Sequence, residues 1–378
     1  MNLLFVVVVP FPFGEASSIR AFNLCKLLSL SGHKVHVISD YPSKTEVNKE
    51  ISFCTYENAE TKYKNGSIVS KSMRAIEKYI DENHINAVLM NARYDRYDKI
   101  VSLCKKRNIK IFVESCEWYD ASSFKLRKLD LRFWLNEKMI RYGFKKADGF
   151  ISISELLNNH NYRLSKNSIY IPTILDVQKI NWKESNNNSR IKIVYAGSLG
   201  RSKELLGPII RVLAKNIDIQ KKITFHIYGA SFKQVCKNIR DKKLLNFVGE
   251  SVVIHGKVSQ TTILEIMRNA DFIFFLRPYR RSSNAGFPTK LGESMAVGTP
   301  VITNNTGDIE KYVCSGKNGY IISSLLENDV YDVLKKVIQL SPKQMDIMRK
   351  NARETAEKYF DYKNYVSEIK SLFNNVER

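Results

Sequence analysis

The segment Asn284-Ala-Gly-Phe-Pro-Thr-Lys-Leu-Gly-Glu-Ser-Met-Ala-Val-Gly-Thr-Pro300 stands directly ahead of the apolar run Val301-Ile302-Thr303. Its turn, Ala285-Gly-Phe-Pro288, predicts a break in the chain that opens a helix over residues 289–297. The apolar run that follows predicts a buried strand. A turn, a helix and a strand in this order are typical of α/β proteins, so we expect the same alternation elsewhere in the chain.

Two charged side chains on the expected helix, Lys290 and Glu293, indicate what this segment binds. The first turn of a helix leaves backbone N–H groups without partners inside the helix, and the helix dipole places positive potential there. Together with the ammonium of Lys290, these groups predict a site for a phosphate-bearing ligand. Glu293 lies about one turn further along the same face, where its carboxylate could accept hydrogen bonds from the hydroxyl groups of a ribose.

Apolar runs of strand length alternate with helical patterns along almost the whole chain. This alternation predicts parallel sheets with helices on both faces, and 378 residues exceed what one hydrophobic core covers. The polar segment 176–190 is the expected linker. The predicted fold is therefore α/β, with two doubly wound, Rossmann-like domains over residues 1–175 and 190–358 that bind ligand at the carboxyl ends of their strands. The expected strands cover residues 3–9, 34–38, 87–90, 109–113 and 149–153, then 191–195, 223–227, 252–254, 272–275, 301–302 and 320–322.

Composition narrows the class of protein further. The formal net charge of +22 implies an anionic partner, which could be nucleic acid, a nucleotide or an acidic membrane surface. The six cysteines form no Cys-x-x-Cys pair, as expected for reduced thiols in the cytoplasm. The apolar run 3–9 is too short to span a bilayer and is interpreted as a strand. Neither Asp-x-Asp nor clustered histidines indicate a metal site, and Gly-x-Ser-x-Gly, which a serine hydrolase would need, does not occur.

A second turn, Tyr195-Ala-Gly-Ser-Leu-Gly-Arg-Ser-Lys-Glu-Leu205, follows the strand expected at 191–195. It would place Gly197, Arg201 and Lys203 at the carboxyl edge of the second sheet. Two cations aimed at a diphosphate would stabilise the charge that develops on a leaving group. The alternative is a solvated basic helix start. A cation at a helix N-terminus opposes the dipole, so a bound anion accounts for these residues better.

From residue 286 to 301 the first segment resembles the donor-binding segment of retaining glycosyltransferases of family 4, whose pattern is roughly Glu-Gly-Phe-Gly/Pro followed by Glu-Ala-Met-Ala-x-Gly-x-Pro-Val. The resemblance implies a GT-B fold whose last helix, about 360–378, crosses back to the first domain. It also implies metal-independent transfer, without a cofactor, from a nucleotide-diphosphate sugar to a glycan or lipid-linked acceptor in capsule, exopolysaccharide or envelope synthesis. The chain departs from the pattern at Ala285, where the family has a glutamate that contacts the sugar. Asn284 or Ser283 is expected to substitute for it.

The resemblance also implies which residues bind and act. Arg201, Lys203 and Glu293 are the expected catalytic residues that hold the donor. Many relatives have a histidine near residues 114–120, where this chain has carboxylates instead, and Glu117 is the expected catalytic residue there, polarising the acceptor hydroxyl. The expected donor-binding residues are Gly14, Gly197, Ser198, Arg201, Lys203, Tyr228, Gly229, Gly256, Val258, Asn284, Gly286, Phe287, Pro288, Lys290, Leu291 and Glu293.

The stretch 124–146 carries eight basic and two acidic residues interleaved with bulky apolar side chains. This pattern is typical of a peripheral segment on anionic lipid, and equally of a helix that packs on its own domain with a solvated basic face. The first interpretation predicts a cytoplasmic protein on the inner face of the cytoplasmic membrane. Two other functions stay open: a non-catalytic GT-B partner subunit that lost turnover through Ala285, and a nucleic-acid-binding protein, which no recognisable motif supports.

Overall fold

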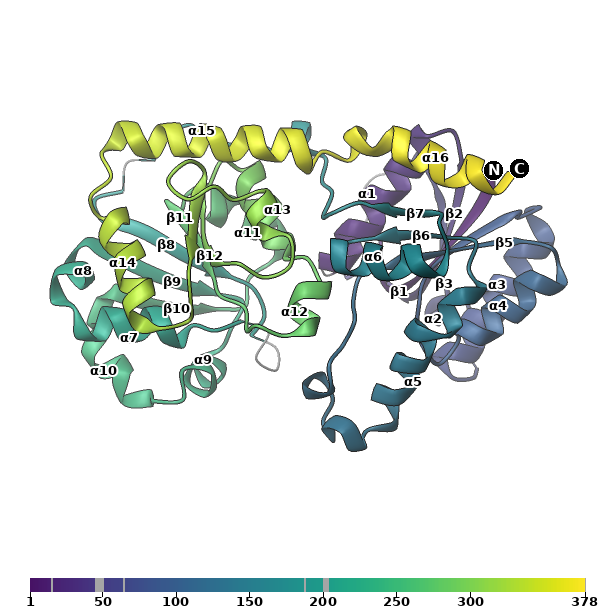
Figure 1. Cartoon of the computed structure of the whole chain (residues 1–378), viewed down its shortest axis with the longest axis horizontal. Coiled ribbons are helices and arrows are strands. Elements are labelled where there is room, and N and C mark those ends of the chain that lie inside the picture. Colours follow the sequence, from purple (N-terminus) through teal and green to yellow (C-terminus); the bar gives the residue numbers. More distant parts are fainter. Residues whose placement is uncertain (15, 45–50, 64, 187, 200–203, 378) are drawn as a thin grey trace. The chain divides into compact units, whose positions relative to one another are not determined.

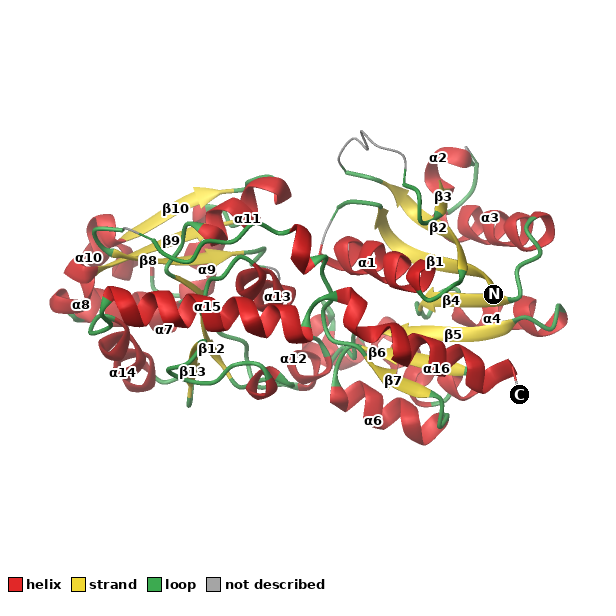
Figure 2. Ribbon diagram, turned by 90° about the horizontal axis from the view of Figure 1, so that it is seen from above, coloured by secondary structure: helices red, strands yellow, loops and turns green. Residues whose placement is uncertain are grey.

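The computed structural model describes residues 1–14, 16–44, 51–63, 65–186, 188–199 and 204–377. The chain divides into two compact units. Unit 1 comprises residues 1–176, 284–287 and 361–378, and unit 2 comprises residues 177–283 and 288–360. Each unit consists of a strand sheet flanked by helices (Figures 1 and 2).

Unit 1 is built on a parallel sheet that, within the described residues, has seven strands in the order β3-β2-β1-β4-β5-β6-β7. The central strand β1 is buried from Leu3 to Val7 without interruption, because helices cover both faces of the sheet. This is why the strand is a continuous apolar run and not an alternating one. The strands are β1 (Asn2–Phe11), β2 (Lys34–Pro42), β3 (Thr55–Asn58), β4 (Ala87–Asn91), β5 (Lys110–Ser115), β6 (Gly149–Ser152) and β7 (Ser168–Tyr170).

The core of unit 1 joins its first and last helices. Leu24 of α1 (Ala16–Leu30) and Phe373 of α16 (Val366–Glu377) share one buried cluster with Phe5 and Phe112 of the sheet. The last helix of the chain thus completes the core of the first unit. The other helices of unit 1 are α2 (Ala59–Lys62), α3 (Ile68–Glu82), α4 (Tyr97–Lys106), α5 (Leu131–Arg141) and α6 (Glu155–Leu164).

Unit 2 repeats the plan with a second parallel sheet, in the order β10-β9-β8-β11-β12-β13 among the described residues. Its strands are β8 (Ile191–Ala196), β9 (Ile223–Tyr228), β10 (Val252–Gly256), β11 (Phe272–Phe275), β12 (Val301–Asn304) and β13 (Gly319–Ile322). Its helices are α7 (Gly207–Lys215), α8 (Ile217–Lys222), α9 (Phe232–Ile239), α10 (Leu245–Val248), α11 (Gln260–Arg268), α13 (Thr289–Ala296), α14 (Glu327–Val337) and α15 (Pro342–Tyr359). The short helix α12 (Arg281–Ala285) has residues in both units.

The predicted fold class is confirmed, and every expected strand is present. β3 and β7 were not predicted, because Thr55-Tyr-Glu-Asn58 and Ser168-Ile-Tyr170 are too short and polar to show a pattern. The expected linker, 176–190, also differs from a free connection. Arg353 of α15 donates to the carbonyl oxygens of Val177 at 3.0 Å and Ile180 at 2.9 Å, so this polar segment is held against unit 2 by contacts distant in sequence.

Candidate donor-binding site

The carboxyl edge of the unit 2 sheet brings together the predicted glycines. Gly197 follows β8, Gly229 follows β9, and Gly256 ends β10. The backbone N–H of Gly197 donates to the carbonyl of Tyr228 at 3.1 Å, and that of Gly229 donates to the carbonyl of Gly256 at 2.6 Å. Three turns from separate parts of the sequence therefore form one hydrogen-bonded edge, where parallel α/β sheets bind ligands.

Gly229 is required at this edge for two reasons. Its φ is +87°, in the left-handed region, and a Cβ there would lie 2.6 Å from the carbonyl oxygen of Gly197. Gly256 also has a positive φ, +74°, but a Cβ there would meet no atom within 4 Å. Gly229 thus allows two backbones to approach closely, whereas Gly256 borders open space.

Lys290, at the start of α13, points its ammonium group toward this edge. The Nζ atom forms an ion pair with Glu204 and lies 5.2 Å from the ring centroid of Tyr195 and 5.7 Å from that of Phe275. A Cβ at Gly197 would lie 3.0 Å from the same Nζ atom. The glycine therefore leaves space directly beside the cation, as the predicted phosphate site requires.

Glu204 is a site residue that the sequence interpretation missed. Its side chain is buried and accepts a hydrogen bond from the Tyr195 hydroxyl at 2.6 Å as well as pairing with Lys290. Burial, reinforced by the neighbouring carboxylate of Glu204, raises the pKa of Tyr195. The carbonyl of Glu204 accepts from Asn238 at 2.7 Å, which fixes the turn. The sequence contained one signal, an acid beside Arg201 and Lys203, but its partner lies 86 residues away.

Two more charged groups belong to the same edge. Burial raises the pKa of the Glu293 carboxyl above its ordinary value of 4.5, and the ammonium of Lys290 opposes the shift. Burial lowers the pKa of Arg277, which follows β11, to about 10, against the attraction of Glu204. The backbone of Arg277 is fixed by Asn304 through hydrogen bonds of 2.7 and 2.8 Å. Arg277 was not predicted, because a lone arginine after a strand has no recognisable pattern.

The predicted loop before α13 is divided between the units. Residues 284–287 group with unit 1, and Pro288 with unit 2. The side chain of Ala285 is fully buried, and its carbonyl accepts a hydrogen bond from Ser154 of unit 1 at 2.7 Å. A carboxylate in place of this methyl group would be buried, so the departure from the family pattern fits its surroundings. The predicted residues Phe287, Pro288 and Leu291 are buried, Asn284 and Gly286 are partly so, and Leu291 extends the apolar face of α13.

The base pocket expected around Tyr228 and Gly256 contains a set of parallel rings. The rings of Tyr228 and His255 stack with centroids 4.0 Å apart and planes 2° apart. Nδ1 of His226 lies 2.9 Å from Nε2 of His255. Burial, helped by Lys192 and His255, lowers the pKa of His226 to about 4, so this imidazole is neutral at pH 7. The predicted residue Val258, three residues after His255 in the sequence, is partly exposed.

The remaining predicted residues either lie outside the residues that the structure describes, are exposed near the edge, or belong to unit 1. Arg201 and Lys203 lie outside the described residues. Ser198 is exposed beside Gly197. Glu117 and Gly14 lie in unit 1, so unit 2 by itself does not bring them to the donor edge. Glu117 is exposed after β5, and a Cβ at Gly14 would lie 2.7 Å from Pro10, which gives that glycine a packing role.

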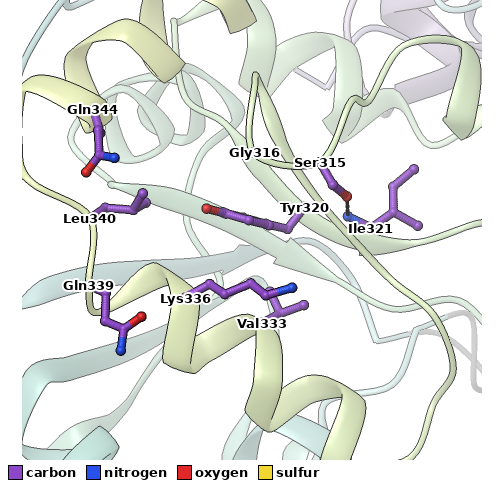
Figure 3. A pocket seen from close by; sticks show the side chains of 9 residues that line it. All are labelled: Ser315, Gly316, Tyr320, Ile321, Val333, Lys336, Gln339, Leu340 and Gln344. Atoms are coloured by element: carbon purple, nitrogen blue, oxygen red, sulfur yellow. Dashed lines mark hydrogen bonds between the residues drawn. The ribbon is translucent and has the colours of Figure 1, made fainter.

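Three further observations delimit the site. Among the described residues, no group of three or more histidine, cysteine, aspartate or glutamate side chains is placed to hold a metal ion. No helix in the described ranges has the length and apolar character needed to cross a membrane. A cavity of about 520 Å³ adjoins the turn before β13 and is lined by Tyr320, Lys336 and Gln344 among others (Figure 3). None of the predicted donor residues lines it.

Comparison with solved structures identifies the architecture as GT-B. Sucrose-phosphate synthase from Thermosynechococcus elongatus aligns with a TM-score of 0.74 at 14% identity, over 100% of this chain and 99% of that chain. WaaG, a glycosyltransferase involved in lipopolysaccharide biosynthesis, aligns at 0.68 and 14%, over 97% and 98%. Anabaena HepE, solved in complex with UDP, aligns at 0.66 and 14%, over 99% and 100%. At these identities the likeness establishes the fold.

A second comparison, with models of protein families, concerns the sequence of unit 2. Residues 176–355 match the family model described as Glycosyl transferases group 1. A search of curated proteins found no match. The group 1 domain coincides with the unit that carries Gly197, Glu204, Lys290 and Glu293, and together with the GT-B fold it supports a glycosyltransferase.

Proposed function

We propose that this protein is a retaining, metal-independent glycosyltransferase of family 4 that moves a sugar from a nucleotide-diphosphate donor to a glycan or lipid-linked acceptor. The observation that carries the proposal is the ion pair between Lys290 and Glu204 beside Gly197. A cation in an open, glycine-lined edge, at the positive end of α13, is suited to exchange its internal carboxylate for a diphosphate.

Each group at the edge has a role in this reaction. Lys290 and Arg277 stabilise the negative charge that builds on the diphosphate as it leaves, together with Arg201 and Lys203. Glu293 accepts hydrogen bonds from the ribose, and the rings of Tyr228 and His255 border the base. The leaving phosphate takes the proton of the acceptor hydroxyl on the face from which it departs. No nucleophile from the enzyme is then needed, which agrees with an alanine at position 285.

The proposed partners are a nucleotide sugar and a glycan or lipid-linked acceptor. HepE, which has the same fold, has been solved in complex with UDP and with UDP-glucose. We place the enzyme in the cytoplasm, at the inner face of the membrane, in capsule, exopolysaccharide or cell-envelope glycan synthesis, because an acceptor with a lipid anchor is presented there. Glu117 is the proposed contact with the acceptor hydroxyl.

The test is a panel of UDP-, GDP- and ADP-sugars incubated with the whole protein, with released nucleotide measured by mass spectrometry. We expect one donor to be hydrolysed slowly without acceptor, at the same rate with and without EDTA. The anomeric configuration of a transferred sugar, measured by NMR, should match that of the donor. An inverted product would overturn the retaining mechanism, and a strict metal requirement would overturn metal independence.

The same panel tests the non-catalytic alternative. A partner subunit would bind a nucleotide with a measurable Kd yet release none from any donor. Isothermal titration with UDP, GDP and ADP therefore accompanies the hydrolysis assay, and saturable binding without turnover would favour the partner subunit over the enzyme.

A further inference from the structure

A row of large apolar side chains on unit 1 faces solvent. Leu126, Leu129, Leu131 and Trp134 are 60%, 88%, 69% and 55% exposed, and we call these four residues the leucine ridge. Leu126 precedes a 3₁₀ turn (Arg127–Leu129) that contains Leu129, and Leu131 and Trp134 lie in the first turn of α5. Several large apolar side chains exposed within nine residues of a folded protein indicate a place of interaction.

Hydrogen bonds within the same segment fix the conformation of the ridge. The indole N–H of Trp134 donates to the carbonyl of Lys128 at 2.7 Å, and Asp130 accepts from the backbone N–H of Arg132 at 3.1 Å. Phe133 of the same helix is buried, so α5 already has a side that packs on unit 1, whereas Leu131 and Trp134 of its first turn are exposed. Figure 1 shows α5 at the lower edge of unit 1, with the preceding turns continuing beyond it.

One residue of the turn keeps an unfavourable backbone conformation. Arg127 has a φ of +51°, a left-handed conformation that is unfavourable for a residue with a Cβ. Glycine would adopt the same backbone without this cost. Arg240 of unit 2 is exposed and has the same kind of backbone, with a φ of +66°, so the argument for a surface contact at Arg127 depends on the apolar and basic side chains next to it.

Basic side chains alternate with the ridge residues in the sequence. Lys125, Arg127 and Lys128 are exposed in the same turn as the leucines. Arg132 pairs with Asp130, and Arg141 pairs with Glu137 within one helical turn. The three residues of the turn therefore contribute most directly to the positive potential around the exposed leucines.

We infer that the leucine ridge inserts into the interface of an anionic bilayer, with Lys125, Arg127 and Lys128 resting on its headgroups. Branched aliphatic side chains match the acyl region, and lysine and arginine match anionic lipid. A second copy of this chain is a poorer occupant, since two proteins of formal charge +22 repel each other. Nucleic acid would use the cations but leave the leucines exposed. The inference rests on the proposed function, because a lipid-linked acceptor requires the enzyme to reach a membrane.

The experiment measures co-sedimentation of the whole protein with vesicles of phosphatidylcholine alone and with 30% phosphatidylglycerol. We expect binding to the anionic vesicles that weakens with salt. Leu126→Ser with Leu129→Ser leaves the charge unchanged and should lower the partition coefficient about tenfold or more, because two inserted side chains are lost. The matched control is Leu326→Ser with Ile217→Ser, which alters two residues of unit 2 that are 69% and 57% exposed, and should bind as the parent protein does.

Each outcome decides the inference. Equal binding by the ridge variant and the parent overturns it, as does equal binding to neutral and anionic vesicles. Dimers that dissociate in the ridge variant, seen by sedimentation velocity without lipid, would assign the ridge to a second copy and overturn the lipid. Donor hydrolysis in solution is measured in parallel: if it persists while vesicle binding fails, the proposed function stands and only the membrane contact is lost.

Discussion

The donor edge of unit 2 and the leucine ridge of unit 1 both use left-handed backbone, but with different residues. At the donor edge the positions are glycines, Gly229 with φ +87° and Gly256 with φ +74°. On the ridge the position is Arg127, with φ +51°. The donor edge therefore omits side chains so that backbones and a ligand can approach, whereas the ridge keeps a side chain despite its conformational cost.

The two regions also differ in how their positive charges are exposed and paired. The ammonium of Lys290 is largely buried and already paired with Glu204, so an anionic ligand must replace an internal partner. Lys125 and Lys128 of the ridge are exposed, where attraction to a surface is additive and screened by salt. The comparison teaches that one donor-edge charge should affect chemistry strongly, while single ridge charges should affect only association.

The largest expected effect is on transfer. Glu293→Gln should lower kcat/KM for the nucleotide sugar about 10²–10³-fold, or about 2.7–4 kcal/mol, if its contact with the donor strengthens in the transition state. Lys128→Gln, on the ridge, should leave transfer to a water-soluble acceptor unchanged. Steady-state kinetics on both variants measure the contrast, and a Glu293→Gln enzyme with near-normal kcat/KM would remove Glu293 from the site.

The pH dependence of the same enzyme gives a second readout. Burial raises the pKa of Glu293 above 4.5, so its carboxylate takes up a proton at a higher pH than an exposed glutamate. A protonated carboxyl is a weaker acceptor for the ribose hydroxyls. Donor affinity should therefore fall as pH drops through this raised pKa, and the fall should be absent in Glu293→Gln. Titrations of nucleotide at several pH values check this, and an unchanged acid limb in the variant would assign it to another group.

The next effect is on stability. Glu204→Gln leaves Lys290 without its charged partner in a mostly buried place and should cost about 3 kcal/mol in free energy of unfolding. The matched change in unit 1 is Asp98→Asn, which breaks the exposed pair with Lys146 and should cost about 0.2–1 kcal/mol. Urea unfolding measures both free energies of unfolding.

Ligand binding gives a further test of the same charge. A nucleoside diphosphate should raise the Tm of Glu204→Gln more than that of the parent protein, because it supplies the missing negative charge. Equal losses in the two variants would contradict the distinction between buried and exposed charge.

The sequence predicted which residues lie near one another in unit 2 where the information is local. Glycines after strands, a lysine at a helix start and a glutamate one turn later are recognisable within a few residues, and the structure places Gly197, Lys290 and Glu293 in unit 2, with Lys290 near the other two. Their role in binding a donor stays a prediction. Glu204 and Arg277 were missed because their roles depend on partners far away in the chain. The acidity of Glu204 was visible, but its burial against Tyr195 depends on how β8 and α13 pack.

For the ridge, by contrast, the sequence could not predict which residues are exposed. Mixed basic and apolar residues at 124–146 allowed both a packed helix and a membrane surface. The structure shows which residues of this stretch pack and which face solvent: Phe133, Met139 and Ile140 are buried, while Leu126 and Leu129 are exposed. Contact of the exposed residues with a membrane stays a prediction. Hydropathy could not make this division, because leucine and phenylalanine score alike and only packing decides which faces solvent. The 3₁₀ turn and the φ of Arg127 were equally invisible.

Substitution of Gly229 at the donor edge should lower stability slightly less than Glu204→Gln does, and Gly316, in the turn before β13, is the comparison. Gly229→Ala adds a left-handed cost and places a Cβ 2.6 Å from the carbonyl oxygen of Gly197, so we expect a loss of about 2–3 kcal/mol in unfolding free energy. Gly316→Ala, with φ +82° and no atom within 4 Å of its Cβ, should lose only about 1 kcal/mol. Thermal and urea unfolding compare them, and Gly229→Ala should also weaken nucleotide binding. Equal losses would mean that the close approach to Gly197 has no energetic consequence.

The smallest expected effect is a gain in stability at the ridge, where the preceding substitutions give losses. Arg127→Gly removes the left-handed strain and should stabilise unit 1 by about 1 kcal/mol while weakening binding to anionic vesicles. Arg240→Gly is the matched control, since Arg240 also has a positive φ, +66°, is exposed and carries the same charge, but lies at the C-terminus of α9 in unit 2. Both variants should unfold at higher urea concentration than the parent protein. Only Arg127→Gly should lose vesicle affinity, by roughly fivefold for one interfacial charge of about 1 kcal/mol. If both variants lost affinity equally, the general positive charge of the protein would account for binding, and the strain at Arg127 would need another explanation.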